Sequence, residues 1–114
     1  MKQLISIIVL IFIATTTSLA QSHIKKDTIE VDGNCDMCKK RIENAAYIKG
    51  VKRADWDKKD KKLVVVYNDS KTTLEKIEQS VAKAGHNTVH VEATEASYKK
   101  LPNCCQYKTE VCEH

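Results

Sequence analysis

The chain between residues 28 and 91 switches between two hydrophobic periods, and each switch predicts a new element. Residues 28–31 alternate apolar and polar side chains, as a half-buried strand does. After a short loop, apolar side chains recur at every fourth position and predict a helix that Gly50 ends. This helical stripe consists of Cys38, Ile42 and Ala46.

The middle of the chain predicts a hairpin. Residues 51–57 have a partly apolar face, and a polar Lys-Lys-Asp-Lys turn follows them. Residues 62–68 are rich in β-branched and aromatic side chains, which favour strands. We expect Trp56 and Tyr67 to pack in the core rather than to form a binding platform. The side chains expected to face inward are Val51, Ala54, Trp56, Leu63, Val65 and Tyr67.

A second helix and a last strand follow the hairpin. Thr72, with Glu75 three positions later, predicts a capping box at the start of this helix. Gly85 stands where a left-handed helix cap belongs. Residues 87–91 are predicted to be a strand. The apolar helical stripe is Leu74, Ile77, Val81 and Ala84, and the inward side chains of the last strand are Val89 and Val91.

The resulting order is β-α-β-β-α-β, which predicts an α+β, ferredoxin-like fold. In this fold an antiparallel sheet carries two helices on one face. Residues from Thr94 onward leave the pattern. They predict a short helix before Pro102, followed by an extension that has little periodicity.

The first twenty residues predict export. Lys2 precedes an apolar run from Leu4 to Ala14, and small residues end the segment at positions 18–20. The run is shorter than the roughly 20 apolar residues that a membrane-spanning helix needs. We therefore predict a signal peptide at 1–20 and a mature, periplasmic chain that starts at Gln21 and does not insert stably into a membrane.

Composition limits the mature chain to one small domain. Its 94 residues carry 18 basic and 15 acidic side chains, which are interspersed. No long basic tract is present, so nucleic acid is not an expected partner. We expect an N-terminal arm at 21–27, a domain at 28–92 and a cysteine-containing extension at 93–114.

The chain has five cysteines, and an exported chain meets an oxidising compartment in which disulfides form by default. The odd count leaves at least one thiol outside an intramolecular disulfide. Two cysteines lie early and three lie late, which does not match a disulfide framework.

Cys35 and Cys38 lie where the first predicted strand leads into the first helix. The free N–H groups and positive dipole of a helix start stabilise thiolates, which predicts lowered thiol pKa values. Two thiolates suit a soft ion such as Cu(I), Hg(II), Zn(II) or Cd(II). Cu(I) tolerates so few ligands, whereas structural Zn(II) normally takes four. An exposed loop with two ligands would also leave room for a partner's thiols.

Several motifs occur together in one known arrangement. They are Gly33-x-Cys35-x-x-Cys38, Gly50-Val51, LVVVY at 63–67 and LEKIEQSVAKAGH at 74–86. With them, residues 28–92 resemble the heavy-metal-associated domain of copper chaperones, metal-pumping ATPases and the periplasmic mercury-binding protein. That family usually has a Met before the first cysteine, whereas here Met37 lies between the two cysteines.

The resemblance implies that Cys35 and Cys38 bind the metal and that the protein is not an enzyme. Cu(I) is the expected cargo, with Hg(II) or Zn(II) as alternatives. The expected partner is a metal-transporting membrane protein or another metal-binding domain. Lys39, Lys40 and Arg41 would stabilise a bound ion or steer docking, or they form an ordinary solvated helix face.

Two other functions fit the same cysteine pair. One is thiol–disulfide exchange, because thioredoxin-like proteins place this motif at a helix start. That fold usually has a cis-proline beside the motif, whereas the single proline of this chain, Pro102, lies in the tail. The other is a structural disulfide in an interaction domain.

Further soft ligands are candidates for accessory metal binding. An imidazole at His86 would be a third ligand or a hydrogen-bond partner of a thiolate; the alternative is a solvated loop histidine. A disulfide between Cys104 and Cys105 would be strained, because adjacent Cα atoms are about 3.8 Å apart whereas disulfides span about 4.4–6.8 Å. Either cysteine would instead bridge to Cys112, fold back to the Cys35 loop, or form a second site with Cys112 and His114.

Overall fold

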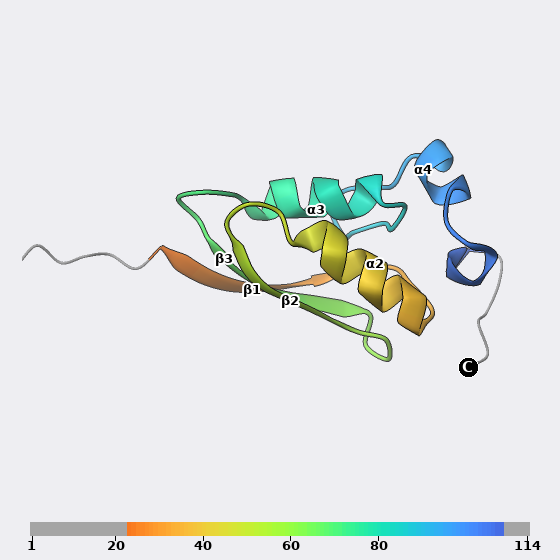
Figure 1. Cartoon of the computed structure of the whole chain (residues 1–114), viewed down its shortest axis with the longest axis horizontal. Coiled ribbons are helices and arrows are strands. Elements are labelled where there is room, and N and C mark those ends of the chain that lie inside the picture. The colour runs from red at the N-terminus through yellow and green to blue at the C-terminus, as the bar shows by residue number, and fades with distance from the viewer. Residues whose placement is uncertain (1–22, 109–114) are drawn as a thin grey trace, which may run out of the picture.

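Three strands form the antiparallel sheet in the order β1-β3-β2 (Figure 1). The computed structural model describes residues 23–108, so the predicted signal peptide, Cys112 and His114 lie outside the described residues. The central strand is β3, which is rich in β-branched residues and pairs with both neighbours: Leu63 lies opposite Ile29 on one side and Trp56 on the other. The strands are β1, Ile24–Glu30; β2, Val51–Asp57; and β3, Lys62–Asn68.

Two helices, α2 (Asp36–Ala46) and α3 (Leu74–Lys83), cover one face of this sheet (Figure 1). The predicted α+β fold is therefore confirmed. One predicted boundary is wrong, since α2 ends four residues before Gly50. Gly50 instead lies in the turn before β2, where its positive φ of 98° requires a glycine.

The cap of α3 also differs from the prediction. The side chain of Thr73, not that of Thr72, accepts a hydrogen bond from the backbone N of Lys76 at 3.2 Å. Thr72 is itself buried. At the other end the prediction is confirmed, because Gly85 has a φ of 107° just after the helix.

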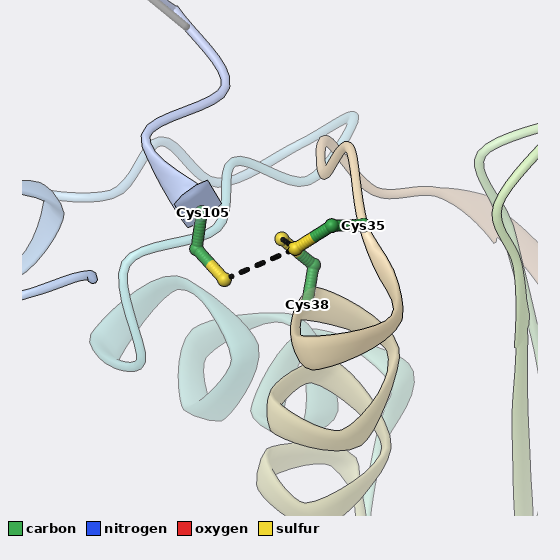
Figure 2. A group of neighbouring side chains, drawn as sticks. All are labelled: Cys35, Cys38 and Cys105. Carbon is green, nitrogen blue, oxygen red and sulfur yellow. Dashed lines mark hydrogen bonds between the residues drawn. The ribbon is translucent and has the colours of Figure 1, made fainter. Parts of the chain in front are cut away.

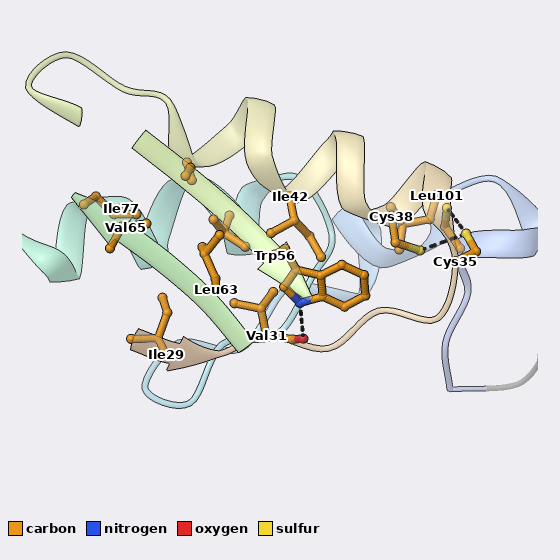
Figure 3. Packing of buried hydrophobic residues seen from close by; sticks show 14 of the residues in the cluster. Ile29, Val31, Cys35, Cys38, Ile42, Trp56, Leu63, Val65, Ile77 and Leu101 are labelled. Carbon is orange, nitrogen blue, oxygen red and sulfur yellow. Dashed lines mark hydrogen bonds between the residues drawn. The ribbon is translucent and has the colours of Figure 1, made fainter. Parts of the chain in front are cut away.

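The core lies between the sheet and the two helices (Figure 3). The predicted inward face of β3 is confirmed, and Trp56 is fully buried. Its indole Nε1 donates a hydrogen bond to the carbonyl oxygen of Val31 at 3.0 Å, which fixes the end of β1 against the tryptophan. The central members of the core are Ile29, Val31, Ile42, Trp56, Leu63, Val65, Ile77 and Val81.

The predicted last strand is reduced to one bridge between Val31 and Thr88. The chain turns back at this point, because the backbone N of Thr88 donates to the carbonyl oxygen of Val91 at 2.8 Å. Val89 is 55% exposed, so the prediction that it faces inward is wrong. Two backbone hydrogen bonds hold the start of this segment beside β1, from Asp32 N to the carbonyl oxygen of Asn87 at 2.9 Å and from Val89 N to that of Glu30 at 3.1 Å.

A buried carboxylate holds this segment in place. Glu78 of α3 is almost fully buried, and it accepts a 2.7 Å hydrogen bond from the Thr88 hydroxyl. It also lies 2.9 Å from Nδ1 of His90 and 3.2 Å from the backbone N of His90. The carboxylate therefore fixes residues 88–90 in addition to the backbone bonds to β1.

We expect Glu78→Ala to lower the free energy of unfolding by about 1–3 kcal/mol, because it leaves buried donors without their acceptor. Urea unfolding followed by circular dichroism measures this loss. Glu75 lies on the exposed side of α3, so Glu75→Ala is the matched control. It should lower the free energy of unfolding by only about a few tenths of a kcal/mol. Equal losses in the two variants would contradict the anchoring role of Glu78.

The C-terminal extension packs against the end of the domain where α2 begins (Figure 1). The predicted short helix is confirmed as α4, Glu95–Lys99, and a 3-10 turn, η1, follows at Asn103–Cys105. Leu101 and Cys105 are both buried. Within residues 23–108 no helix has the length and apolar character needed to cross a membrane.

Candidate metal centre

The loop between β1 and α2 rests on Trp56. A Cβ built on Gly33 would lie 3.0 Å from two carbons of the indole ring and 3.1 Å from the Cβ of Cys38. Only a residue without a side chain allows this approach without displacing its neighbours. The sequence predicted Trp56 as a core residue, but not its contact with the loop. The glycine two positions before Cys35 was the only signal of that contact.

Three sulfur atoms meet at the start of α2 (Figure 2). The Sγ atom of Cys35 lies 3.2 Å from that of Cys38 and 3.4 Å from that of Cys105. All three lie within 4.8 Å of one another. The separations exceed the S–S bond length of about 2.05 Å, so these atoms are not joined as disulfides. The predicted pair thus becomes a cluster of three through a residue of the extension.

The cluster is buried, in contrast to the exposed loop that the sequence predicted. At most 2% of any of the three residues is exposed. Burial raises the pKa of the Cys38 thiol, although hydrogen bonding to Asn34 opposes this shift. Burial also raises the pKa of Cys105. The prediction of lowered thiol pKa values is therefore wrong for Cys38 and Cys105, which without a cation favour the neutral thiol.

The three converging ligands are all cysteine sulfurs. Among the described residues, Cys35, Cys38 and Cys105 form the one group of three or more His, Cys, Asp or Glu ligand atoms that converges closely enough to hold an ion. Asp36, the nearby oxygen donor, is exposed and pairs with Lys58 at 3.4 Å. Such a set suits thiophilic ions better than oxygen-preferring ones.

His86 lies outside the three-sulfur group, and it is not a solvated loop residue either. It is fully buried, and Nδ1 lies 2.7 Å from the carbonyl oxygen of Asp32, so Nδ1 carries the proton. Its ring stacks on Tyr107, with centroids 5.6 Å apart. Burial, assisted by the charge of Arg41, lowers the pKa of His86 below its usual value, although the hydrogen bond to Asp32 opposes this.

This lowered pKa predicts a loss of stability in mild acid. The unfolded chain takes up a proton near pH 6.5, whereas folded His86 resists it because Nε2 is buried without an acceptor among the described residues. Stability should therefore fall as the pH drops below about 6.5, by up to about 1.4 kcal/mol per pH unit.

Unfolding of the metal-free protein between pH 7 and pH 5 measures this effect. His86→Asn is the matched control, because its amide can replace the Nδ1 donor but does not titrate. The other histidines are common to both proteins, so their contributions cancel. Equal pH slopes in the two proteins would contradict the assignment.

Cys104 lies at the outer side of the cluster. Its Sγ atom is 3.5 Å from Sδ of Met37 and 4.0 Å from Sγ of Cys105. The two adjacent cysteines are not bonded to each other, which agrees with the strain expected for such a bridge. Cys112, the other partner proposed for these cysteines, lies outside the described residues.

Lys39 makes contacts within the fold. Its Nζ atom lies 2.8 Å from Glu43, 2.9 Å from Asp55 and 2.8 Å from the carbonyl oxygen of Trp56. These contacts join α2 to β2 beside the loop. Lys40 and Arg41 remain exposed, as an ordinary helix face would be.

Comparisons with solved structures give metal-binding proteins of the same fold. The CopZ metallochaperone is 28% identical, with a TM-score of 0.55, and the match covers 57% of this chain and all of that one. Oxidized MerP from Ralstonia metallidurans CH34 is 27% identical, with a TM-score of 0.54 over 57% of this chain and 93% of that one.

A further similar structure is the N-terminal domain of a potential copper-translocating P-type ATPase from Bacillus subtilis in the Cu(I)-loaded state. It is 25% identical, with a TM-score of 0.54, and the match covers 57% of this chain and 84% of that one. A comparison with curated proteins gives no match. The model of the heavy-metal-associated domain matches residues 28–87, which is more than half of the chain. The chain therefore belongs to the heavy-metal-associated domain family.

Proposed function

We propose that this protein binds Cu(I), or a similar thiophilic ion, through Cys35 and Cys38. It then buffers the ion or passes it to a partner. The observation that carries this proposal is the convergence of the two sulfurs, 3.2 Å apart, at the N-terminal end of a helix. The positive end of the helix favours the negative charge that two thiolates and one Cu(I) carry together.

Copper is favoured over other ions by the character of the ligands. Among the His, Cys, Asp and Glu side chains of the described residues, the three that converge are all cysteines, and Cu(I) accepts a small number of soft ligands. Zn(II) normally takes four ligands in a structural site. Two of the similar structures are the CopZ metallochaperone and a Cu(I)-loaded ATPase domain, which supports copper as the cargo. Oxidized MerP is equally similar, so Hg(II) is the second candidate.

We propose binding and transfer rather than catalysis. Thiol–disulfide exchange needs an accessible thiolate to attack its substrate. Cys35 and Cys38 are buried, and burial raises the pKa of Cys38. In the arrangement seen here, both features disfavour the oxidoreductase alternative. We accordingly expect the protein to reduce insulin no faster than the same concentration of free thiol does.

Competitive titration of the reduced protein with Cu(I), Hg(II) and Zn(II), read by native mass spectrometry, tests the proposal. We expect one tightly bound Cu(I) or Hg(II) per chain, and displacement of Zn(II) by either ion. Preferential retention of Zn(II) would contradict a soft-ion carrier. If the protein keeps Hg(II) when Cu(I) is supplied at a concentration buffered by a chelator, the mercury alternative is favoured.

We further propose that the protein works after export, in the periplasm or an equivalent space. The motivation is the signal-peptide pattern of residues 1–20. A metal-transporting membrane protein or another metal-binding domain is the proposed partner. The intact mass of the secreted chain should correspond to a start at Gln21. A mass that includes the first twenty residues would contradict cleavage.

A further inference from the structure

The third sulfur of the cluster comes from outside the residues that match the family model. That match ends at residue 87, whereas Cys105 lies 18 positions later, in η1. Figure 2 shows Cys105 approaching Cys35 and Cys38 from a separate segment. Cys105 can stay in this position only if the extension is held against the domain. The contacts between the extension and the domain therefore determine whether Cys105 can act as a ligand.

One docking contact is a close approach at Gly85. A Cβ on this residue would lie 2.8 Å from the Leu101 side chain and 2.8 Å from the carbonyl oxygen of Ser97. Leu101 is only 3% exposed, so the extension buries an apolar side chain against the end of α3. Gly85 therefore caps the helix and also provides the space in which the extension fits.

A second contact lies on the other side of Cys105, at Tyr107. Its hydroxyl accepts a hydrogen bond from the backbone N of Asn87 at 2.9 Å and donates one to the carbonyl oxygen of Gly85 at 3.0 Å. Its ring stacks on His86 and meets Tyr98 edge-on, with centroids 5.1 Å apart. Cys105 is thus fixed between two anchors, Leu101 before it and Tyr107 after it.

The docked extension covers the Cys35 side of the site, where the Cys105 sulfur lies 3.4 Å from that of Cys35. Cys35 and Cys38 are 2% and 0% exposed, so a partner's thiols have no access to an ion held between them. Transfer between such sites needs the incoming thiol to reach the ion before the outgoing one leaves. The arrangement seen here therefore retains an ion, and a second arrangement is needed to release it.

We propose that residues 101–107 form a lid on the metal centre. When the lid is docked, Cys105 is the third thiolate ligand, and the ion is held by three sulfurs. When the lid lifts, the ion keeps only Cys35 and Cys38 and becomes accessible to a partner. This proposal rests on the proposed function and adds a mechanism of retention and release.

The ligand exchange balances without any redox step. Each thiol that becomes a ligand loses its proton to solvent, so a docked site that binds one ion releases up to three protons. Lifting of the lid breaks one metal–sulfur bond, and Cys105 takes up a proton again. Cu(I) accepts either ligand number, so both states of the lid can hold the same ion.

The sulfur count around bound copper tests the third ligand. The reduced protein loaded with one Cu(I) should show three sulfur neighbours by X-ray absorption, and Cys105→Ser should show two. We expect the affinity of Cys105→Ser, measured by chelator competition, to fall by at least about tenfold, since even indirect partners of metal ligands contribute 10–100-fold.

Cys104→Ser is the matched control, because Cys104 is adjacent to Cys105 in the sequence but its sulfur lies outside the three-sulfur group. It should retain three sulfur neighbours and the affinity of the wild type. Because Cys104 could replace its neighbour in the single variant, Cys104→Ser/Cys105→Ser is measured as well. Two sulfur neighbours in the wild type, or an unchanged count in the double variant, would overturn the proposal.

The rate at which a chelator removes the ion tests the lid. Tyr107→Ala removes one anchor but no sulfur, so we expect removal at least about tenfold faster than from the wild type. Tyr107→Phe keeps the ring and loses the two hydroxyl hydrogen bonds, and it should give an intermediate rate. Tyr47→Ala is the control, because it removes the same side chain from an exposed position. Equal rates in all four proteins would overturn the lid.

The two proposals fail separately. If the variants of Cys105 and Tyr107 behave like the wild type while loss of Cys35 and Cys38 abolishes binding, the lid is rejected and the proposed function stands. If loss of Cys35 and Cys38 leaves binding unchanged, the proposed function fails, and the lid on that site fails with it.

Discussion

Replacing both Cys35 and Cys38 by Ser is expected to abolish tight binding of the soft ion. A hydroxyl does not ionise at neutral pH and is a poor ligand for Cu(I) or Hg(II). The variant keeps only one of the three converging thiols, Cys105. We expect its affinity to fall by more than about a hundredfold, because even indirect partners of metal ligands contribute 10–100-fold.

Chelator competition measures this affinity, and native mass spectrometry gives the stoichiometry. The substitution buries two hydroxyls, each at a cost of about 1–3 kcal/mol if it finds no partner. Cys35→Ala/Cys38→Ala is therefore a second variant that avoids this cost. Circular dichroism establishes that both variants fold, and Cys104→Ser controls for the loss of a thiol elsewhere. Wild-type stoichiometry and affinity in both folded variants would refute the assignment of the site.

The sequence predicts the fold well where the hydrophobic period is long and regular. The stripe of Cys38, Ile42 and Ala46 is buried as expected, and so is the inward face of β3. Both patterns are local, because the spacing of apolar residues alone decides which face of an element packs. The exact ends of the helices are harder to predict. At the start of α3, for example, Thr72 and Thr73 are adjacent and either hydroxyl can cap the helix.

The last predicted strand shows where local patterns fail. Val89 and Val91 alternate with polar residues, as in a strand, yet the segment turns back on itself. The buried Glu78 stabilises this turn by binding both Thr88 and His90. A tertiary contact thus overrides the β propensity of the valines.

The candidate site was predictable only in part for the same reason. The spacing of Cys35 and Cys38 is a local feature, whereas the position of Cys105 depends on how the extension docks. The sequence left that segment with several alternatives, and His86 with two. Docking through Leu101 and Tyr107 is long-range packing, which no period in the sequence encodes.

The contact between Trp56 and the metal loop carries the second large expected effect. The indole is fully buried, packs closely against Gly33 and donates a hydrogen bond from Nε1 to the carbonyl oxygen of Val31. Trp56→Ala should lower the free energy of unfolding by about 3–5 kcal/mol, as truncation of a buried aromatic residue does. Against a total of about 5–15 kcal/mol, such a loss approaches the limit of folding.

Trp56→Phe tests the loop without removing the core. It retains one buried ring but leaves the carbonyl oxygen of Val31 without its indole donor, which should cost about 1–3 kcal/mol. Because that carbonyl and Gly33 position the loop that carries Cys35, we expect the affinity for Cu(I) to fall together with stability. Tyr67→Phe is the control, since it loses a 2.6 Å hydrogen bond to Asp27 on the sheet, away from the loop. Urea unfolding and chelator competition measure the two quantities. If both variants lose stability while both keep the wild-type affinity, Trp56 supports the core alone and does not position the metal loop.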